Sequence, residues 1–133
     1  MGLDMNMYET LGEELTTQDL FEEDKYETLP CWYWRKANQI HKWFVDNIQG
    51  GVDNCNLYEV SIDQIKKLHR VVKETLRTKN TSKLPPDNGF FFGSTTVDEF
   101  YWEDLRSTKK YLEEMIHSHE TTGTSRFFYH ASW

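Results

Sequence analysis

The amino-acid sequence predicts an α+β fold in a single domain, residues 1–133, with about three helices packed on a small sheet that includes the N- and C-terminal strands. Three patterns lead to this fold class: alternating apolar residues at the N-terminus, helical spacing of apolar residues in three internal segments, and an aromatic stretch at the C-terminus. A chain of 133 residues has room for one core of ordinary size. Because 15% of the residues are aromatic, we expect rings to fill much of that core.

The two ends of the chain are predicted to be strands. In residues 2–8, Leu3, Met5 and Met7 alternate with polar residues and so fall on one face of an extended chain. Residues 126–133 form a final strand that is rich in aromatic side chains. We expect this strand to serve the core or to pair edge to edge with a second copy, and the oligomeric state stays open.

The first predicted helix begins at Trp34 and ends before Gly50 and Gly51, which are typical stop signals. The residues of its predicted buried face recur at the three- and four-residue spacing of an amphipathic helix. They are Trp34, Ala37, Ile40, His41, Trp43, Phe44 and Ile48.

The second predicted helix opens with a capping box, Ser61 with Gln64 three residues later. It ends before the loop at residues 84–89, because paired prolines interrupt a helix. Its predicted buried residues are Ile62, Ile65, Leu68, Val72 and Leu76. Basic residues occupy its other faces, namely Lys66, Lys67, Arg70, Lys73 and Arg77.

The third predicted helix opens with another possible capping box, Thr96 with Glu99. Its apolar stripe consists of Val97, Tyr101, Leu105, Thr108, Leu112 and Met115. Three phenylalanines at residues 90–92 precede it, and they are expected to form a buried strand or a turn that faces the core.

Charge is unevenly distributed along the chain. The net charge is −7, and residues 1–30 carry nine acidic residues against one lysine, whereas the other 103 residues carry 13 acidic and 14 basic residues. A nearly neutral body lacks the basic stripe that phosphate backbones require, so direct nucleic-acid binding is not expected. Residues 10–30 show no sustained period and are interpreted as an acidic loop or insertion.

The acidic segment at residues 10–30 has two interpretations. It is a solvated loop that helps to keep the protein soluble, or it docks on a basic host protein, as a mimic of nucleic acid does. In the second interpretation the candidate partner-binding residues are Glu13, Glu14, Asp19, Glu22, Glu23 and Asp24.

A candidate ligand-binding face lies at the start of the first predicted helix. Indole, guanidinium, amide and imidazole groups are concentrated there, and such groups bind anionic or heteroaromatic ligands by stacking and bidentate hydrogen bonds. Together with the turn before the third helix, the candidate ligand-binding residues are Trp34, Arg35, Asn38, His41, Gly93, Ser94 and Tyr101. The alternative is an ordinary amphipathic helix with its tryptophans in the core, followed later by a turn that caps the third helix.

No cofactor, metal site or catalytic motif is predicted. His41 lies in an apolar stripe, where a structural hydrogen bond would satisfy its imidazole, and a general base with Asp98 or Asp104 as its partner is the alternative. No serine or cysteine stands at a motif spacing that would make it a nucleophile for this histidine. The chain has neither an apolar run of about 20 residues nor a secretory signal, so we expect a cytoplasmic location and no membrane contact.

Five sequence features together resemble a family of small uncharacterised proteins of tailed phages, prophages and bacteria. They are the opening Met-Gly-Leu-Asp-Met, the segment Trp-Arg-Lys-x-Asn-x-Ile-His-x-Trp-Phe, the segment Gly-Phe-Phe-Phe-Gly, the following Asp-Glu-x-Tyr and the terminal Ser-Trp, at residues 1–5, 34–44, 89–93, 98–101 and 132–133. The acidic segment departs from this pattern, as an insertion would. The resemblance implies a phage or prophage setting and transfers no catalytic or binding residue.

In that setting we expect a non-enzymatic accessory protein that binds and inhibits a host factor, such as an anti-defence or anti-CRISPR inhibitor. The first alternative is a small-ligand pocket, built from the candidate residues above, that sequesters a nucleotide-like molecule. The second alternative is a small enzyme with His41 as its base. It ranks last because the sequence shows no nucleophile, cofactor or metal site for it.

Overall fold

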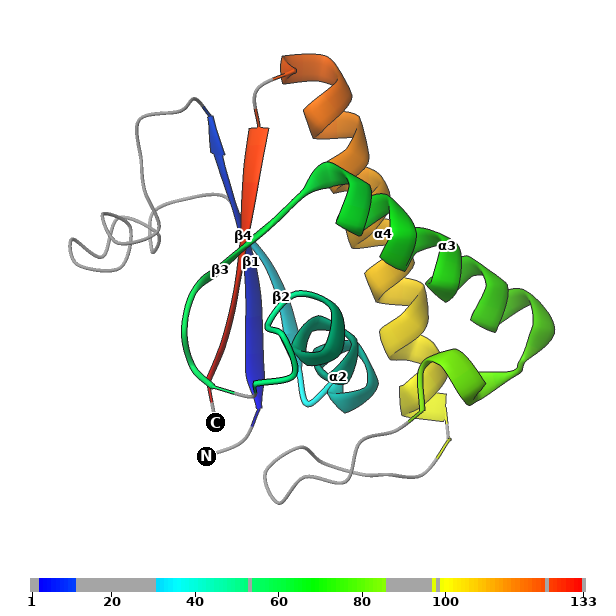
Figure 1. Ribbon diagram of the computed structural model, residues 1–133. Coiled ribbons are helices and arrows are strands. Elements are labelled where there is room, and N and C mark those ends of the chain that lie inside the picture. The colour runs from blue at the N-terminus through cyan, green and yellow to red at the C-terminus, as the bar shows by residue number, and fades with distance from the viewer. Residues whose placement is uncertain are drawn as a thin grey trace.

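The structure is a computed structural model that describes residues 3–11, 31–52, 54–85, 97, 99–123 and 125–132. The elements run in the order β1 (Asp4–Leu11), β2 (Cys31–Arg35), α2 (Asn38–Asn47), β3 (Tyr58–Val60), α3 (Ile62–Thr78), the 3-10 helix η2 (Thr81–Lys83), α4 (Glu99–Thr122) and β4 (Ser125–Ser132). The strands form one antiparallel sheet in the order β2-β1-β4-β3, and α2, α3 and α4 lie on one side of it (Figure 1). The predicted α+β fold, with both terminal strands in the sheet, is confirmed.

β1 and β4 pair at the centre of the sheet, and alternate residues of both strands belong to the core. Met5 lies opposite Trp34 of β2 on one side and Ala131 of β4 on the other, and Met7 lies opposite Tyr129 of β4. Both methionines are 0% exposed. The predicted N-terminal strand is confirmed together with its buried face, although the strand continues further along the chain than the alternation indicated.

β4 is an internal strand of the sheet. It pairs with β1 from Ser125 to Ser132 and, on its other side, with β3 at Phe127–Tyr129. Phe127 and Phe128 are at most 1% exposed, so the aromatic residues serve the core. β3 covers the second edge of β4 only at Phe127–Tyr129, so the expectation that this strand pairs edge to edge with a second copy stays a prediction.

The first helix begins later than its apolar spacing indicated. Trp34 and Arg35 belong to β2, and α2 begins at Asn38. Between the two elements Lys36 has a φ of 58° and donates its backbone N–H to the Leu3 carbonyl at 2.7 Å, which turns the chain out of the sheet. The prediction failed because the two-residue period of a strand and the four-residue period of a helix both place Trp34 on the buried side.

The capping box of α3 is confirmed. The Ser61 hydroxyl accepts from the Gln64 backbone N–H at 3.2 Å, and the Gln64 side-chain carbonyl accepts from the Ser61 backbone N–H at 2.8 Å. The helix ends at Thr78, where Lys79 takes up a left-handed φ of 60° before the chain reaches the prolines. The buried residues of α3 are Ile65, Leu68, Val72 and Thr75.

α4 is the longest helix, and it packs against α3 and β4. Its buried residues are Tyr101, Leu105, Thr108, Leu112 and Met115, as the apolar stripe predicted. The stripe was wrong at Val97, which precedes the helix and is 42% exposed. Thr96 and residues 90–92 lie outside the described residues, so the second capping box and the phenylalanine strand stay predictions.

Replacing Ser61 with Ala should lower the free energy of unfolding by about 1 kcal/mol, because the Gln64 amide loses its side-chain acceptor. Urea unfolding followed by circular dichroism measures this change. Ser107→Ala, at an exposed position within α4, is the control and should stay within about 0.5 kcal/mol of the wild type. Equal losses in the two variants would show that the cap contributes nothing of its own.

Candidate anion-binding groove

Trp34 and Arg35 were predicted to bind a ligand together, but they are neighbours in a strand and lie on opposite faces of the sheet. Trp34 is 4% exposed, and its indole N–H donates to the Thr108 hydroxyl at 2.7 Å. Arg35 is exposed and lies opposite Asp4 in the register of β1 and β2. A ligand on one side of the sheet therefore meets only one of these two side chains.

His41 lies inside the core. It is 0% exposed, and its Nδ1 is 2.7 Å from the Tyr129 hydroxyl, while Phe44 stacks on the Tyr129 ring with centroids 3.9 Å apart. Asn38, another candidate ligand residue, is 3% exposed in the first turn of α2. His41 thus has the structural hydrogen bond that the sequence indicated, and its role as a base stays a prediction.

Tyr101 is also part of the core. Its hydroxyl donates to the Leu84 carbonyl at 2.6 Å, and its own carbonyl accepts from the Gln39 side chain at 3.4 Å. Burial raises the pKa of Tyr101 to about 12. The structure therefore places this phenol where it ties α4 to the end of η2.

The remaining candidates lie outside the described residues, and their ligand and partner roles stay predictions. They are Gly93, Ser94, Asp98, Glu13, Glu14, Asp19, Glu22, Glu23 and Asp24.

A different set of residues forms a continuous surface on α3. Lys66, Arg70, Lys73 and Arg77 follow one another at intervals of four, three and four residues, which places them on one side of the helix. We call these four residues the basic face. The apolar residues of α3 occupy the opposite side and belong to the core, so the basic face is directed away from the sheet.

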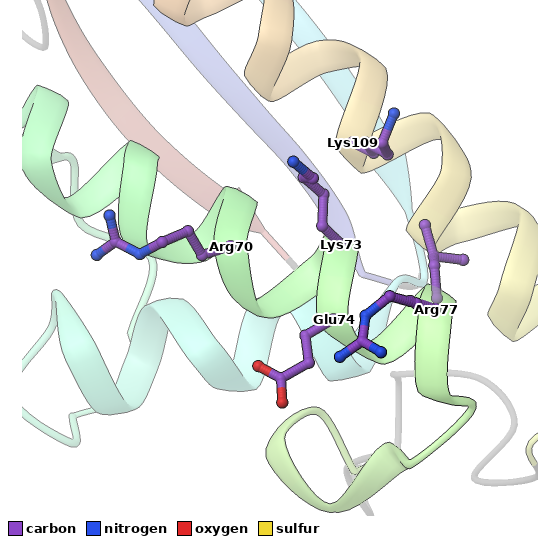
Figure 2. A pocket seen from close by; sticks show the side chains of 6 residues that line it. Arg70, Lys73, Glu74, Arg77 and Lys109 are labelled. Carbon is purple, nitrogen blue, oxygen red and sulfur yellow. The ribbon is translucent and has the colours of Figure 1, made fainter.

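A groove with a volume of about 530 Å³ lies between the basic face and α4. Its lining residues are Arg70, Lys73, Glu74, Leu76, Arg77 and Lys109. Figure 2 shows the cationic side chains coming from both helices, with the Glu74 carboxylate directed away from the ammonium groups of Lys73 and Lys109. Basic side chains from both helices thus line the groove.

Two acidic residues near the groove, Glu74 and Glu113, have basic partners. Glu74 pairs with Lys83 at 3.4 Å and also lines a smaller neighbouring cavity of about 90 Å³. Lys109 lies 3.2 Å from Glu113, which also lies 3.1 Å from the His69 ring. The hydrogen bond from His69, with help from Lys109, holds the pKa of the Glu113 carboxyl below its ordinary value.

Three cations of the groove have no acidic partner in the part of the chain that the structure describes. Arg70, Lys73 and Arg77 are exposed, and none of them takes part in an ion pair among the described residues. Arginine presents a planar fork of donors and lysine a point charge, and both recognise oxyanions. Leu76 and the aliphatic stems add apolar contact. The arrangement therefore suits an anion with several charges.

These basic residues were predicted to lie on the exposed faces of a helix and were not predicted to form a site. Their regular spacing from Lys66 to Arg77 was visible in the sequence and could have indicated a single basic face. The contribution of Lys109 could not be foreseen, because it depends on how α3 packs against α4.

No family model, no curated protein and no solved structure matches this chain. Within the described part of the chain, no helix has the length and apolar character of a membrane span. The same residues contain no group of three or more His, Cys, Asp or Glu side chains placed to hold a metal ion. What the groove binds must follow from its own residues and charges.

The high pKa of Tyr101 predicts a loss of stability in alkali. With a folded pKa of about 12 against an ordinary value of 10, the protonated phenol stabilises the fold fully below pH 10, and this contribution is lost as the pH rises towards 12. Urea unfolding across this window should show a smaller decline for Tyr101→Phe than for the wild type. Tyr58→Phe, which removes a part-buried hydroxyl bonded to Asn54, should decline as the wild type does. A parallel decline in all three proteins would contradict the assignment to Tyr101.

Proposed function

We propose that this chain is a non-enzymatic binding protein that holds an anionic partner in a stoichiometric complex, with the groove between α3 and α4 as its contact surface. The observation that carries the proposal is the set of three exposed cations, Arg70, Lys73 and Arg77, without acidic partners among the described residues. Like charges three and four residues apart destabilise a helix by tenths of a kcal/mol per pair. A bound anion removes this repulsion.

The rigidity of the groove walls supports binding. Both helices are anchored by buried residues of one core cluster, among them Leu68 and Val72 of α3 and Leu105 and Leu112 of α4. A surface whose backbone is held by packing loses little conformational freedom when a ligand binds. Only the long side chains must be ordered, at a cost of about 0.5–1.5 kcal/mol each.

In the phage setting that the sequence resemblance implies, we propose that the partner belongs to the host and that the complex inhibits it. An anti-defence or anti-CRISPR inhibitor needs no chemistry of its own, because it acts by occupying a surface or withholding a ligand that the host enzyme uses. The nucleotide-like molecule considered as an alternative is the small-molecule form of such an anionic partner.

A second proposed contact has the opposite charge. Residues 10–30 contain seven acidic residues and one lysine, which suits docking on a basic host protein. Because the two contacts require partners of opposite sign, they can be told apart. A partner held by the acidic residues would be insensitive to substitutions in the groove.

The groove should bind pyrenetetrasulfonate, a small fluorescent anion with four charges, when the full chain is titrated at low ionic strength and fluorescence anisotropy is followed. The double variant Arg70→Glu/Arg77→Glu should bind it about tenfold more weakly, because two attractive charges become repulsive. Added salt should also weaken binding of this anion to the wild type, because the dissolved ions screen the attraction between the charges.

The matched control is Lys67→Glu/Lys110→Glu, which makes the same change in net charge at exposed positions that do not line the groove. It should keep the wild-type affinity within about twofold, since these sites lie outside the groove. Equal weakening in both double variants would show that only overall charge matters and would remove the groove as the contact surface. No binding to the wild type would contradict the proposed function itself.

A further inference from the structure

We infer that the anionic groups held by the groove are linked phosphates, as in a nucleotide or an inorganic polyphosphate. This inference rests on the proposed function, because it names the ligand of the same groove. It separates phosphates from the carboxylates of an acidic peptide, which are the other common anionic groups in a cell. Three properties of the groove distinguish the two: its volume, the spacing of its cations and the geometry of its donors.

The volume favours an anion of high charge density. Four cations and one carboxylate line the groove, whose volume is about 530 Å³. One turn of a docked helix, with a diameter of 10–12 Å and a pitch of 5.4 Å, fills roughly 500 Å³. Such a turn directs at most about two carboxylates at the groove. Each phosphate group brings between about one and two negative charges in a much smaller space.

The spacing of the cations also favours a compact chain of charges. Arg70, Lys73 and Arg77 are separated by rises of about 4.5 and 6 Å along the helix axis. In an extended peptide, successive residues on one side are roughly 7 Å apart. The carboxylates on one side of an extended acidic peptide therefore do not match the spacing of these cations. Linked phosphates carry a charge on every group.

Donor geometry adds a further distinction. The two oxygens of a carboxylate are satisfied by the fork of a single arginine. A terminal phosphate has a third acceptor oxygen that remains available to a neighbouring ammonium group. With Lys73 between Arg70 and Arg77 on α3 and Lys109 on the facing helix, phosphates use both kinds of donor.

The ligand is small rather than a long nucleic acid. The basic face extends over 12 residues, from Lys66 to Arg77, and the 11 steps between its ends span about 16 Å of helix. The chain as a whole has a net charge of −7. Because this negative charge lies in residues 1–30 and the other 103 residues are nearly neutral, a polyanion longer than the groove gains no further attraction beyond it, in keeping with the sequence-based expectation that nucleic acid is not bound directly.

The test compares inorganic pyrophosphate with citrate, two small anions of similar net charge near neutral pH, by isothermal titration calorimetry on the full chain. Pyrophosphate should bind about tenfold more tightly. Arg70→Gln/Arg77→Gln should weaken pyrophosphate binding about tenfold, and Lys67→Gln/Lys110→Gln should leave it within about twofold. Lys73→Gln is a second groove variant in case the double variant unfolds, and circular dichroism checks each fold.

Equal affinities for citrate and pyrophosphate would overturn the phosphate inference while leaving an anion-binding groove in place. Pyrophosphate binding that both double variants retain would overturn the groove as its site. If the wild type binds neither anion and also fails to bind pyrenetetrasulfonate, both the phosphate inference and the proposed function are overturned.

Two further titrations identify the source of the phosphates. Adenosine triphosphate binding more tightly than inorganic tripolyphosphate would support a nucleotide, since the base and ribose then add contacts. Equal binding of the two would support recognition of the phosphate chain alone. A single-stranded oligothymidylate that binds more tightly than either would overturn the assignment to a small ligand.

Discussion

The pairing of β1 with β4 is the constraint on which the rest of the structure depends. It joins residues 4–11 to residues 125–132 in one register. Bringing together two segments more than a hundred residues apart costs conformational entropy, and burial of apolar surface by the two strands must offset that cost. Their core side carries Met5, Met7, Phe127 and Tyr129, all at most 1% exposed. The three helices lie over this central pair on the same side of the sheet (Figure 1).

The groove is a consequence of this closure. α4 leads into β4 through Gly123, whose φ of 70° and backbone hydrogen bond to the His119 carbonyl at 2.8 Å end the helix next to the strand. α3 then packs against α4, and burial of its apolar residues turns its basic face away from the sheet. The cations therefore come together because of how the core is built, although the core makes no use of their charge.

The fold could be predicted from the sequence further than the site could. Apolar periods located both terminal strands, and the Ser61 capping box located the start of α3, because these signals act over a few neighbouring residues. The start of the first helix could not be placed, since Trp34 fits both the strand and the helix period. The groove escaped prediction for a different reason: Lys109 and the basic face meet only through helix packing, which no local pattern describes.

The candidate residues also show why residue type alone is a weak guide to function. Tryptophan, histidine and tyrosine have a large apolar surface and a polar group, so a core can use them as well as a binding site can. Trp34, His41 and Tyr101 each bury their ring and satisfy the polar atom with a hydrogen bond inside the protein. An exposed arginine or lysine without a partner contributes little to the fold. A group of such cations on one rigid helix face is therefore better evidence of binding than Trp34, His41 and Tyr101, because the core positions the cations without using their charge.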